Sequence, residues 1–327
     1  MVEFTSLRPG ILTTTLDEEQ TTVTLIVGES QALLIDTGST PEVGNEIREA
    51  VKRETNVPLT TVVLTHGHWD HSFGLGAFAD LDTIGHEDLA QDLQCAENLE
   101  WAKNHGIDPA TLQYPTSLLS AIAVRDLGGL TVEIAHFGRA HTRTDLIVAV
   151  PTRAVIAVGD LVEEGPPQFD ETSSLDGWVR SLDSLYALLR PDTVVIPGHG
   201  QPLDPGYVSH FRVGLAAIWD QSEWAYHQGI PLEHVYDHAD LQWPWDRTTA
   251  ETAIAVAYRE LNSPHIGTAH FVPLCGPNVG QGDGPILSHS PSLSQYENPL
   301  VTLLLLLRLG QIGTVPLSHI LSQCGES

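Results

Sequence analysis

Lysine is nearly absent from this 327-residue chain, which has two lysines, thirteen arginines and 42 acidic residues, so its formal net charge is −27. A field of that sign repels the phosphate backbone of nucleic acid and the anionic headgroups of membranes. We therefore expect no nucleic-acid partner and no membrane partner. The expected partner is a small-molecule substrate.

Cysteines and long apolar runs are also scarce. The three cysteines, Cys95, Cys275 and Cys324, have the spacing of neither a disulfide framework nor a zinc knuckle, which is typical of free thiols in a reducing compartment. The longest apolar run, residues 303–307, is far shorter than the roughly 20 residues of a membrane helix. Residues 1–10 lack the basic start and apolar stretch of a targeting signal. We expect a cytoplasmic protein.

Short apolar segments separated by turn residues predict a mixed α/β fold with two sheets and outer helices. Residues 21–27 and 32–35 are typical of strands joined by a turn. Thr40 followed by Pro41 indicates the capped start of a helix that runs to about residue 54. We expect further strands at residues 61–64, 130–135, 146–150, 154–158 and 193–196, and a helix at residues 175–189.

The remaining segments suggest how the chain is divided. We expect residues 1–206 to form the catalytic domain, within which the polar segment 86–129 is a helical insertion, either a lid over a site or a surface excursion. Residues 207–262 predict a C-terminal helical extension. Residues 263–327 are rich in Ser, Pro, Leu and Gly and have only four charged side chains. We expect this low-charge tail to be disordered or not native to the fold.

The strongest chemical signal directly follows the predicted strand 61–64, where residues 65–71 read THGHWDH. A loop at the end of a strand can aim His66 and His68 at one point. Asp70 and His71 stand where the chain turns into a helix, so they can point at a neighbouring spot. Imidazole and carboxylate are ligands for Zn²⁺, Fe or Mn, whereas metals that prefer thiolates are excluded.

Three later residues extend this candidate ligand set. His141, Asp160 and His199 each follow a predicted strand and stand near a glycine. Taken singly, each could be an ordinary turn residue. Three in succession at the same kind of position instead predict a metal site built from several strand ends.

This ordered set resembles the metallo-β-lactamase superfamily, over residues 12–205, about three fifths of the chain. The resemblance implies a four-layer αβ/βα sandwich with the metals at one edge of the two sheets. It further implies a role for Asp36, as an acid that orients a ligand loop. The metal ligands it implies are His66, His68 and His141 for the first metal, Asp70, His71 and His199 for the second, and Asp160 as a bridge.

A carboxylate at position 160 separates this chain from many antibiotic-resistance enzymes of the superfamily, which have cysteine there. Asp160 instead resembles the bridge of glyoxalase-II-like thioesterases, lactonases and phosphodiesterases. We expect a hydrolase with two Zn²⁺ per chain, or Fe or Mn in their place, acting on an ester, lactone, thioester or amide. A hydroxide shared by metals about 3.5–4 Å apart would attack the substrate. Asp70 is the expected catalytic residue that orients this hydroxide and passes its proton to the leaving group.

The substrate pocket has three candidate residues, Trp69, Glu163 and Phe169. Glu163 and Glu164 follow shortly after Asp160 and either face the pocket, where they would disfavour anionic substrates, or face solvent. Two other activities stay open, a mononuclear-iron oxidoreductase resembling persulfide dioxygenases and a β-lactam hydrolase. A binding protein without turnover is disfavoured by the complete ligand set.

Deletion of residues 263–327 is expected to leave folding and hydrolysis nearly intact, because this tail contains none of the proposed metal ligands and almost no charge. Thermal unfolding of the full chain can be compared with that of a chain ending at Asn262. The two unfolding temperatures should agree within a few degrees, since about 1 kcal/mol shifts a domain of this size by about 2–4 °C. Insolubility or large destabilisation of the shorter chain would show that the tail is integral.

Overall fold

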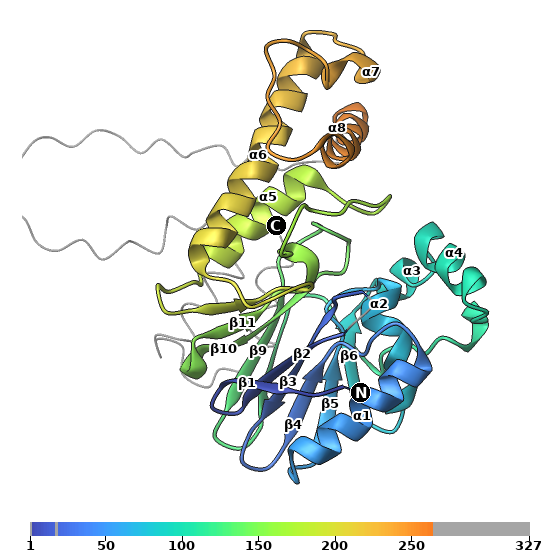
Figure 1. Ribbon diagram of the computed structural model, residues 1–327, viewed down its shortest axis with the longest axis vertical. Coiled ribbons are helices and arrows are strands. Elements are labelled where there is room, and N and C mark those ends of the chain that lie inside the picture. Colours follow the sequence, from blue (N-terminus) through green and yellow to red (C-terminus); the bar gives the residue numbers. More distant parts are fainter. Residues whose placement is uncertain (1, 17–18, 264–327) are drawn as a thin grey trace, which may run out of the picture.

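The computed structural model describes residues 2–16 and 19–263 (Figure 1). Two β-sheets pack face to face and helices cover their outer sides, which confirms the four-layer αβ/βα sandwich expected from the sequence. The low-charge tail from residue 264 onward, with Cys275 and Cys324, lies outside the described residues. The expectation about that tail therefore stays a prediction.

The first sheet contains seven strands in chain order, of which the first four are antiparallel and the last four parallel, β4 being shared. Alternate side chains of a strand point to opposite faces. Leu33 and Ile35 thus face the second sheet, while Ala32 and Leu34 face the outer helix. The strands are β1 (Thr5–Arg8), β2 (Ile11–Thr15), β3 (Thr22–Val27), β4 (Ala32–Ile35), β5 (Leu59–Val63), β6 (Asp82–His86) and β7 (Ser117–Leu119).

The second sheet contains five strands in the order β12-β11-β10-β9-β8. These strands are β8 (Ile122–Asp126), β9 (Thr131–His136), β10 (Leu146–Val150), β11 (Val155–Ala157) and β12 (Val194–Ile196). Because β9 and β11 are both antiparallel to β10, and β12 is parallel to β11, the loops after β9, β11 and β12 open at one edge. The amide of Leu146 donates to the carbonyl of Thr65 at 2.7 Å, which joins that edge to the loop after β5.

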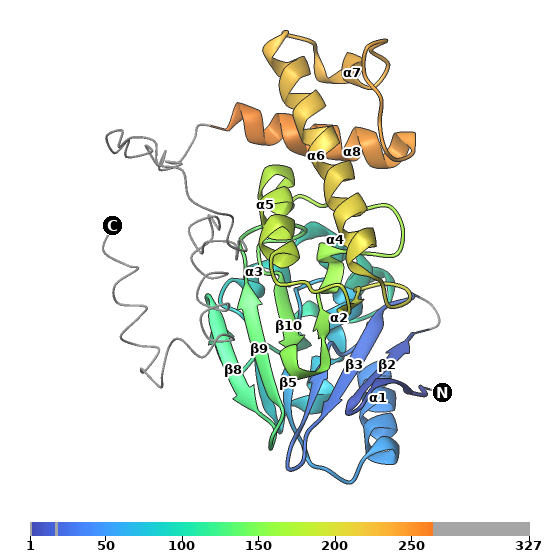
Figure 2. The same ribbon diagram turned by 90° about the vertical axis from the view of Figure 1, so that its left-hand side faces the viewer.

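Helices cover the outer face of each sheet. Helix α1 (Pro41–Glu54) begins where predicted, with the Thr40 hydroxyl accepting the Val43 amide at 3.2 Å, and it packs on the first sheet. The second sheet is covered by α5 (Leu175–Tyr186) and α6 (Pro205–His227). Beyond the end of the sheet, α8 (Arg247–Asn262) packs on α5 and α6, and α7 (Leu232–Val235) packs on α6 and α8, so helices follow residue 206 as expected (Figure 2). Trp178 of α5 is fully buried in this second core. Within the described residues, no helix has both the length and the apolar character needed to cross a bilayer.

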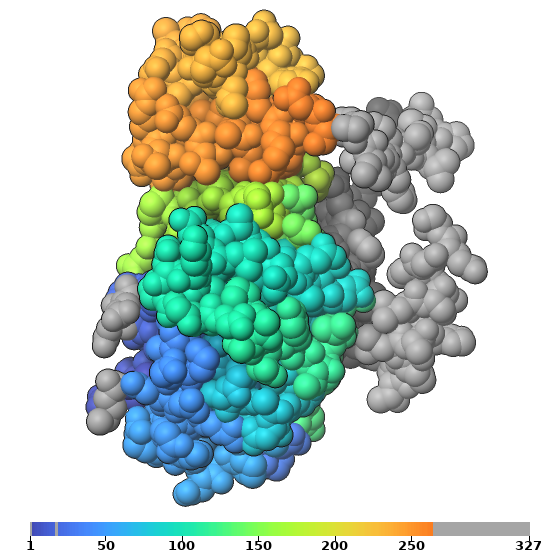
Figure 3. Space-filling view, turned by 90° about the vertical axis from the view of Figure 1, so that its right-hand side faces the viewer, coloured from blue at the N-terminus to red at the C-terminus, as the bar shows by residue number. Residues whose placement is uncertain are grey.

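The segment 86–129 differs from the expected helical insertion. It contains α3 (Leu89–Asp92) and α4 (Ala96–Asn104), but also β7 and β8, so the expectation of a purely helical segment is wrong. Both strands are short and half-exposed, and therefore lack the apolar run by which the other strands were recognised. In the space-filling view, this teal and green segment forms much of one face of the molecule, below the orange α8 (Figure 3).

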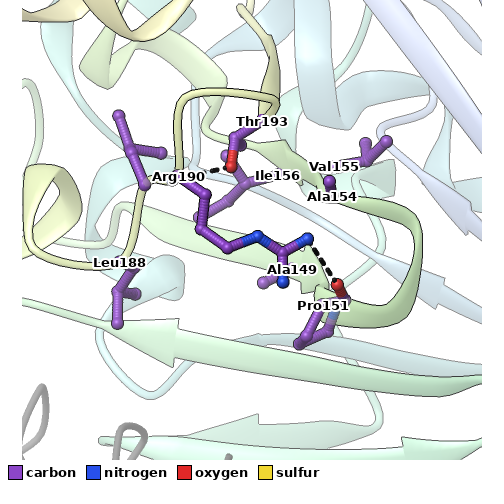
Figure 4. Close-up of a pocket in the computed structure, with 9 residues that line it drawn as sticks. Ala149, Pro151, Ala154, Val155, Ile156, Leu188, Arg190 and Thr193 are labelled. Carbon is purple, nitrogen blue, oxygen red and sulfur yellow. Dashed lines mark hydrogen bonds between the residues drawn. The ribbon is translucent and has the colours of Figure 1, made fainter.

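The connection from α5 to β12 is fixed on the β10–β11 turn, at the sheet edge opposite to the loops after β9 and β11 (Figure 4). The Arg190 guanidinium donates to the carbonyl of Pro151 at 3.2 Å, and the Arg190 amide donates to the Thr193 hydroxyl at 2.9 Å. The pocket between these segments has a volume of about 20 Å³. That space suits a single water at most, so this pocket supports the start of β12 rather than ligand binding.

Candidate metal centre

The seven predicted metal ligands meet where β5, β9, β11 and β12 end. They lie in the loop after β5, in α2 (Trp69–Ser72), in the loop after β9, in the short turn Gly159–Leu161 after β11, and in the loop after β12. Each residue contributes a ligand atom to one of two groups, within which these atoms lie within 4.8 Å of one another. The first group is His66, His68, His141 and Asp160, and the second is Asp70, His71 and His199.

The first group has the spacing of a tetrahedral ligand shell. His68 Nδ1 lies 3.1 Å from His66 Nε2 and 3.0 Å from His141 Nε2. The Asp160 Oδ2 atom lies 3.6 Å from His66 Nε2 and 3.5 Å from His141 Nε2. Four ligands around a zinc ion at 2.0–2.2 Å stand about 3.3–3.6 Å apart. The two distances from Asp160 match this spacing and the two from His68 are slightly shorter, so the donor atoms surround a space close to that of a bound ion.

The second group has similar spacing and shares Asp160 with the first. His71 Nε2 lies 3.3 Å from His199 Nε2 and 3.4 Å from Asp70 Oδ2, and His199 Nε2 lies 3.3 Å from Asp70 Oδ2. Asp160 Oδ1 lies 3.2 Å from His71 Nε2, and Asp160 Oδ2 lies 3.3 Å from His199 Nε2. The Asp160 carboxylate therefore stands between the groups, where a bridging ligand would stand.

The buried oxygen Asp160 Oδ1 accepts no hydrogen bond from the described residues. A buried carboxylate oxygen left in this way costs free energy, which a cation bound beside it would offset. The donor set, five imidazoles and two carboxylates, is also the set that zinc, iron and manganese accept. The residues present therefore fit a metal site.

The second nitrogen of every imidazole is occupied by an oxygen acceptor, which fixes the tautomer and leaves the other nitrogen free to bind a metal. The carbonyls of Glu19 and Gln168 accept from Nδ1 of His199 and His141, at 2.9 and 3.2 Å. The remaining acceptors are Asp36 Oδ2 for His71 Nδ1 at 2.8 Å, Asp170 Oδ2 for His68 Nε2 at 3.1 Å, and the Thr65 hydroxyl for His66 Nδ1 at 3.0 Å.

Asp36 stands at the centre of this network, in the place that the resemblance implied. Its carboxylate is buried and accepts from the amide and the hydroxyl of Thr65 and from His71, each at 2.8 Å. The Thr65 hydroxyl donates its single proton to Asp36, so it is an acceptor toward His66. One carboxylate thus orients an imidazole from each metal group.

Two residues that support the site were not found from the sequence. Asp170 accepts from His68 and also from the backbone amides of Thr172 and Ser173, at 2.6 and 2.8 Å. A sequence signal for it existed, because an aspartate two residues before a Thr-Ser pair is typical of a self-capped turn. Asn98 of α4 gave no such signal, since its role depends on contacts distant in sequence.

The Asn98 amide holds the metal loop to α4. Its Nδ2 donates to the carbonyl of Gly67 at 2.7 Å, and its Oδ1 accepts the amide of Trp69 at 2.9 Å. Asn98 is fully buried, and Gly67 packs so closely that a Cβ there would lie 2.6 Å from the Asp92 Cβ. The segment 86–129, through α3 and α4, thus holds in place the loop that carries His66 and His68.

The potential of the site favours a cation. Burial opposes a charge on His199, yet the carboxylates of Asp160 and Asp70 outweigh burial and raise its pKa to about 12. Burial also opposes a charge on His71, and Asp70, Asp160 and Asp36 together raise its pKa well above the usual value. The negative potential that stabilises a proton on each of these histidines would also stabilise a metal ion. Metal binding would therefore displace these protons.

A cavity of about 330 Å³ opens over both groups, and Trp69 and Phe169, two of the predicted pocket residues, line it. The third, Glu163, does not line this cavity. Glu163 is buried and accepts from the amide and the side chain of Gln168 at 3.3 and 3.1 Å. Burial, together with the nearby negative charge of Asp160, raises the pKa of Glu163 to about 8. Glu163 was expected to line the substrate pocket, but in the structure its side chain folds back under its own loop.

Fold and site together define a metal-binding αβ/βα sandwich protein. The family model described as the metallo-beta-lactamase superfamily matches residues 16–199. This match covers more than half of the chain, so the chain belongs to that superfamily, as the sequence motif predicted.

Curated relatives match the same part of the chain at low identity. A metallo-beta-lactamase type 2 from Bacillus sp. (strain 170) is 25% identical over 190 residues, which are 57% of this chain and 69% of the relative. Metallo-beta-lactamase domain-containing protein 1 from Xenopus laevis is 28% identical over 186 residues, 55% of this chain and 70% of that protein. The alpha subunit of 2,4-dinitroanisole O-demethylase from Nocardioides sp. (strain JS1661) is 26% identical, and the match covers 53% of this chain and 51% of that subunit.

Solved structures show the same fold. A metallo-beta-lactamase from Pontibacter korlensis has a TM-score of 0.54 and 21% identity, and the match covers 66% of this chain and 99% of that one. A stereoselective inverting sec-alkylsulfatase from Pseudomonas sp. has a TM-score of 0.66 and 16% identity, and the match covers 84% of this chain. The larger share shows that this second likeness extends beyond the β-lactamase-like part. This chain spans about half, 52%, of the alkylsulfatase.

Replacing Asn98 by alanine is expected to weaken metal binding by about 10–100-fold, the usual effect of losing a group that orients a ligand loop. Its removal frees the Gly67 carbonyl and the Trp69 amide, so His66 and His68 lose their fixed positions. Zinc affinity measured by competition with a chromophoric chelator gives the comparison. Asn104→Ala, at the exposed end of the same helix, is the control and should bind zinc as the wild type does. Equal affinity of the two variants would refute the role of Asn98.

Proposed function

We propose that this protein is a hydrolase that holds two divalent metal ions, zinc before iron or manganese, and cleaves an ester, lactone, thioester or amide. The observation that carries the proposal is the orientation of the five imidazoles. Each donates through one nitrogen to an oxygen acceptor and directs the other at one of the two ligand groups. A chance cluster of histidines would not be oriented in this way at every member.

The metals, when bound, would polarise the carbonyl of the substrate and lower the pKa of water from 15.7 toward about 7. Asp160, which lies between the two ligand groups, would help to hold both ions. Asp70 lines the cavity, and its Oδ2 accepts from the Thr21 hydroxyl at 2.8 Å, which fixes the carboxylate. From that position Asp70 would orient the attacking water, take up its proton and pass that proton to the leaving group.

The ligand set supports a dinuclear site over a mononuclear iron site. A single ion needs only some of the seven ligands. Asp70, His71 and His199 would then form a second, largely buried ligand group with no cation bound among them. Hydrolysis of β-lactams remains the second candidate, because several relatives are named metallo-beta-lactamases. The described residues that line the cavity include no lysine or arginine to receive the carboxylate of such antibiotics. We therefore favour uncharged or cationic carbonyl substrates.

Replacing Asp160 by alanine is expected to remove the metal of the second group more completely than that of the first. The first group keeps three imidazoles, whereas the second keeps two imidazoles and one carboxylate. Elemental analysis after dialysis against a zinc buffer should give close to one zinc per chain for Asp160→Ala and two for the wild type. Equal loss from both groups, seen as fractional occupancy without a one-metal plateau, would contradict the bridging role.

The activity is tested by a screen of zinc-loaded protein against esters, lactones, thioesters, amides, β-lactams and phosphodiesters. We expect hydrolysis of carbonyl substrates without negative charge, and a loss of kcat of about 10²–10⁴-fold in Asp70→Asn, the usual contribution of a positioned acid–base group. Metal content of Asp70→Asn is measured in parallel, because Asp70 is also a proposed ligand. A protein with two zinc ions that cleaves none of these classes would contradict the proposed function.

A further inference from the structure

The cavity over the metal centre is lined both by members of the ligand groups and by acids outside them. Its floor is formed by the ligand groups, where bound divalent metals would outweigh the charges of Asp70 and Asp160. Three further acids, Glu19, Glu97 and Asp170, also line the cavity without belonging to either ligand group, and Asp170 accepts from His68. Among the described residues no lysine or arginine lines it, so the charge of the cavity away from the metals is negative, and Glu97 is the exposed member of the three acids.

Glu97 has no other evident role in the fold. It is exposed on α4, and its carboxylate makes no hydrogen bond or salt bridge with another residue of the described ranges 2–16 and 19–263. The position of Glu97 is nevertheless fixed, because the next residue, Asn98, is bonded to Gly67 and Trp69 of the metal loop.

An aromatic side chain lines the same cavity as this carboxylate. Trp69 lines the same cavity and stacks on Trp101 with ring centroids 4.2 Å apart and an interplanar angle of 12°. Trp101 stacks in turn on His105 at 3.9 Å, so the indole of Trp69 is held in place from behind. An aromatic face beside a carboxylate is the combination that binds ammonium groups, through cation–π attraction and charge pairing.

We propose that the substrate carries a cationic group, an ammonium or a quaternary ammonium, and that Glu97 with the face of Trp69 selects it at the mouth of the cavity. This inference rests on the proposed hydrolase function and adds the substrate class to it. The electron-rich carbonyl oxygen of the substrate would lie toward the metals, and its cation toward Glu97. An anionic substrate would meet Glu97 and Glu19 with no cationic side chain nearby to balance them.

The test uses three para-nitrophenyl esters whose acyl chains end in a trimethylammonium, a tert-butyl or a carboxylate group. The first two have the same shape and differ only in charge. Zinc-loaded wild-type protein should give the highest kcat/KM with the cationic ester and the lowest with the anionic one. In Glu97→Gln the ratio of kcat/KM for the cationic over the neutral ester should fall about two- to fivefold, mainly through KM, as expected for an exposed charge pair. In Glu97→Lys the anionic ester should become the better of the two charged substrates.

Glu100→Gln is the matched control, because Glu100 lies exposed on the same helix and does not line the cavity. It should leave the ratio between the esters unchanged. In the wild type the preference should weaken as salt is added, since the pair is exposed to solvent. Equal ratios in the wild type, Glu97→Gln and Glu100→Gln would overturn the selection by Glu97.

A binding measurement separates this inference from the proposed activity. Aminoethanethiol and mercaptopropionate both bind zinc through sulfur, and they differ in the charge at the other end. Their dissociation constants with the zinc-loaded protein, measured by calorimetry, should favour the ammonium compound in the wild type and lose that preference in Glu97→Gln. Such a preference in a protein that hydrolyses no ester would contradict the hydrolase and support the cation subsite. Equal binding of both thiols in all variants would overturn the cation subsite.

Discussion

The buried carboxylate of Asp36 is the constraint on which the metal centre depends. It stands at the end of β4 and binds the amide and the hydroxyl of Thr65 and the ring of His71. Asp36 has a positive φ of 65°, a conformation that costs a residue with a side chain about 1–2 kcal/mol. Three hydrogen bonds to a charged group, at about 1.5–3 kcal/mol each, outweigh that strain. The loop from β5 is thereby held against the neighbouring strand with its imidazoles already oriented.

The rest of the site extends the same principle. Asp170 orients His68, backbone carbonyls orient His141 and His199, and Asn98 holds the loop between the two histidines of the motif. None of these supports is a proposed metal ligand, yet they come from both halves of the sandwich. The site is therefore assembled only when the two sheets pack on each other. This is why a fold with four layers is needed to position seven side chains.

Much of this architecture could be predicted from the sequence. The strand Leu146–Val150 is a continuous apolar run, and α1 has a capping threonine followed by proline, so both were located at their observed bounds. The ligand candidates were recognised because histidines and aspartates after successive strands form a pattern along the chain. The strands β7 and β8 were missed since short, half-exposed strands lack apolar periodicity.

The supporting residues were harder to predict because their partners are distant in sequence. Asn98 bonds to residues 29 and 31 positions away, and Asp170 to a histidine 102 positions away. Glu163 was placed in the pocket because it follows Asp160 closely, but a turn directs it toward Gln168. Local spacing therefore identified the groups that would bind metal, whereas only the packed structure shows which groups orient them and which line the cavity.

In the proposed site, five pre-oriented imidazoles and two carboxylates hold two metals. Anomalous diffraction from crystals of the zinc-loaded protein, collected on both sides of the zinc absorption edge, tests it most directly. We expect two peaks, one bounded by His66 Nε2, His68 Nδ1 and His141 Nε2 and the other by Asp70, His71 and His199, with ligand distances of about 2.0–2.2 Å. A single peak, or peaks bound through the ring nitrogens now hydrogen-bonded to Asp36 and Asp170, would contradict it.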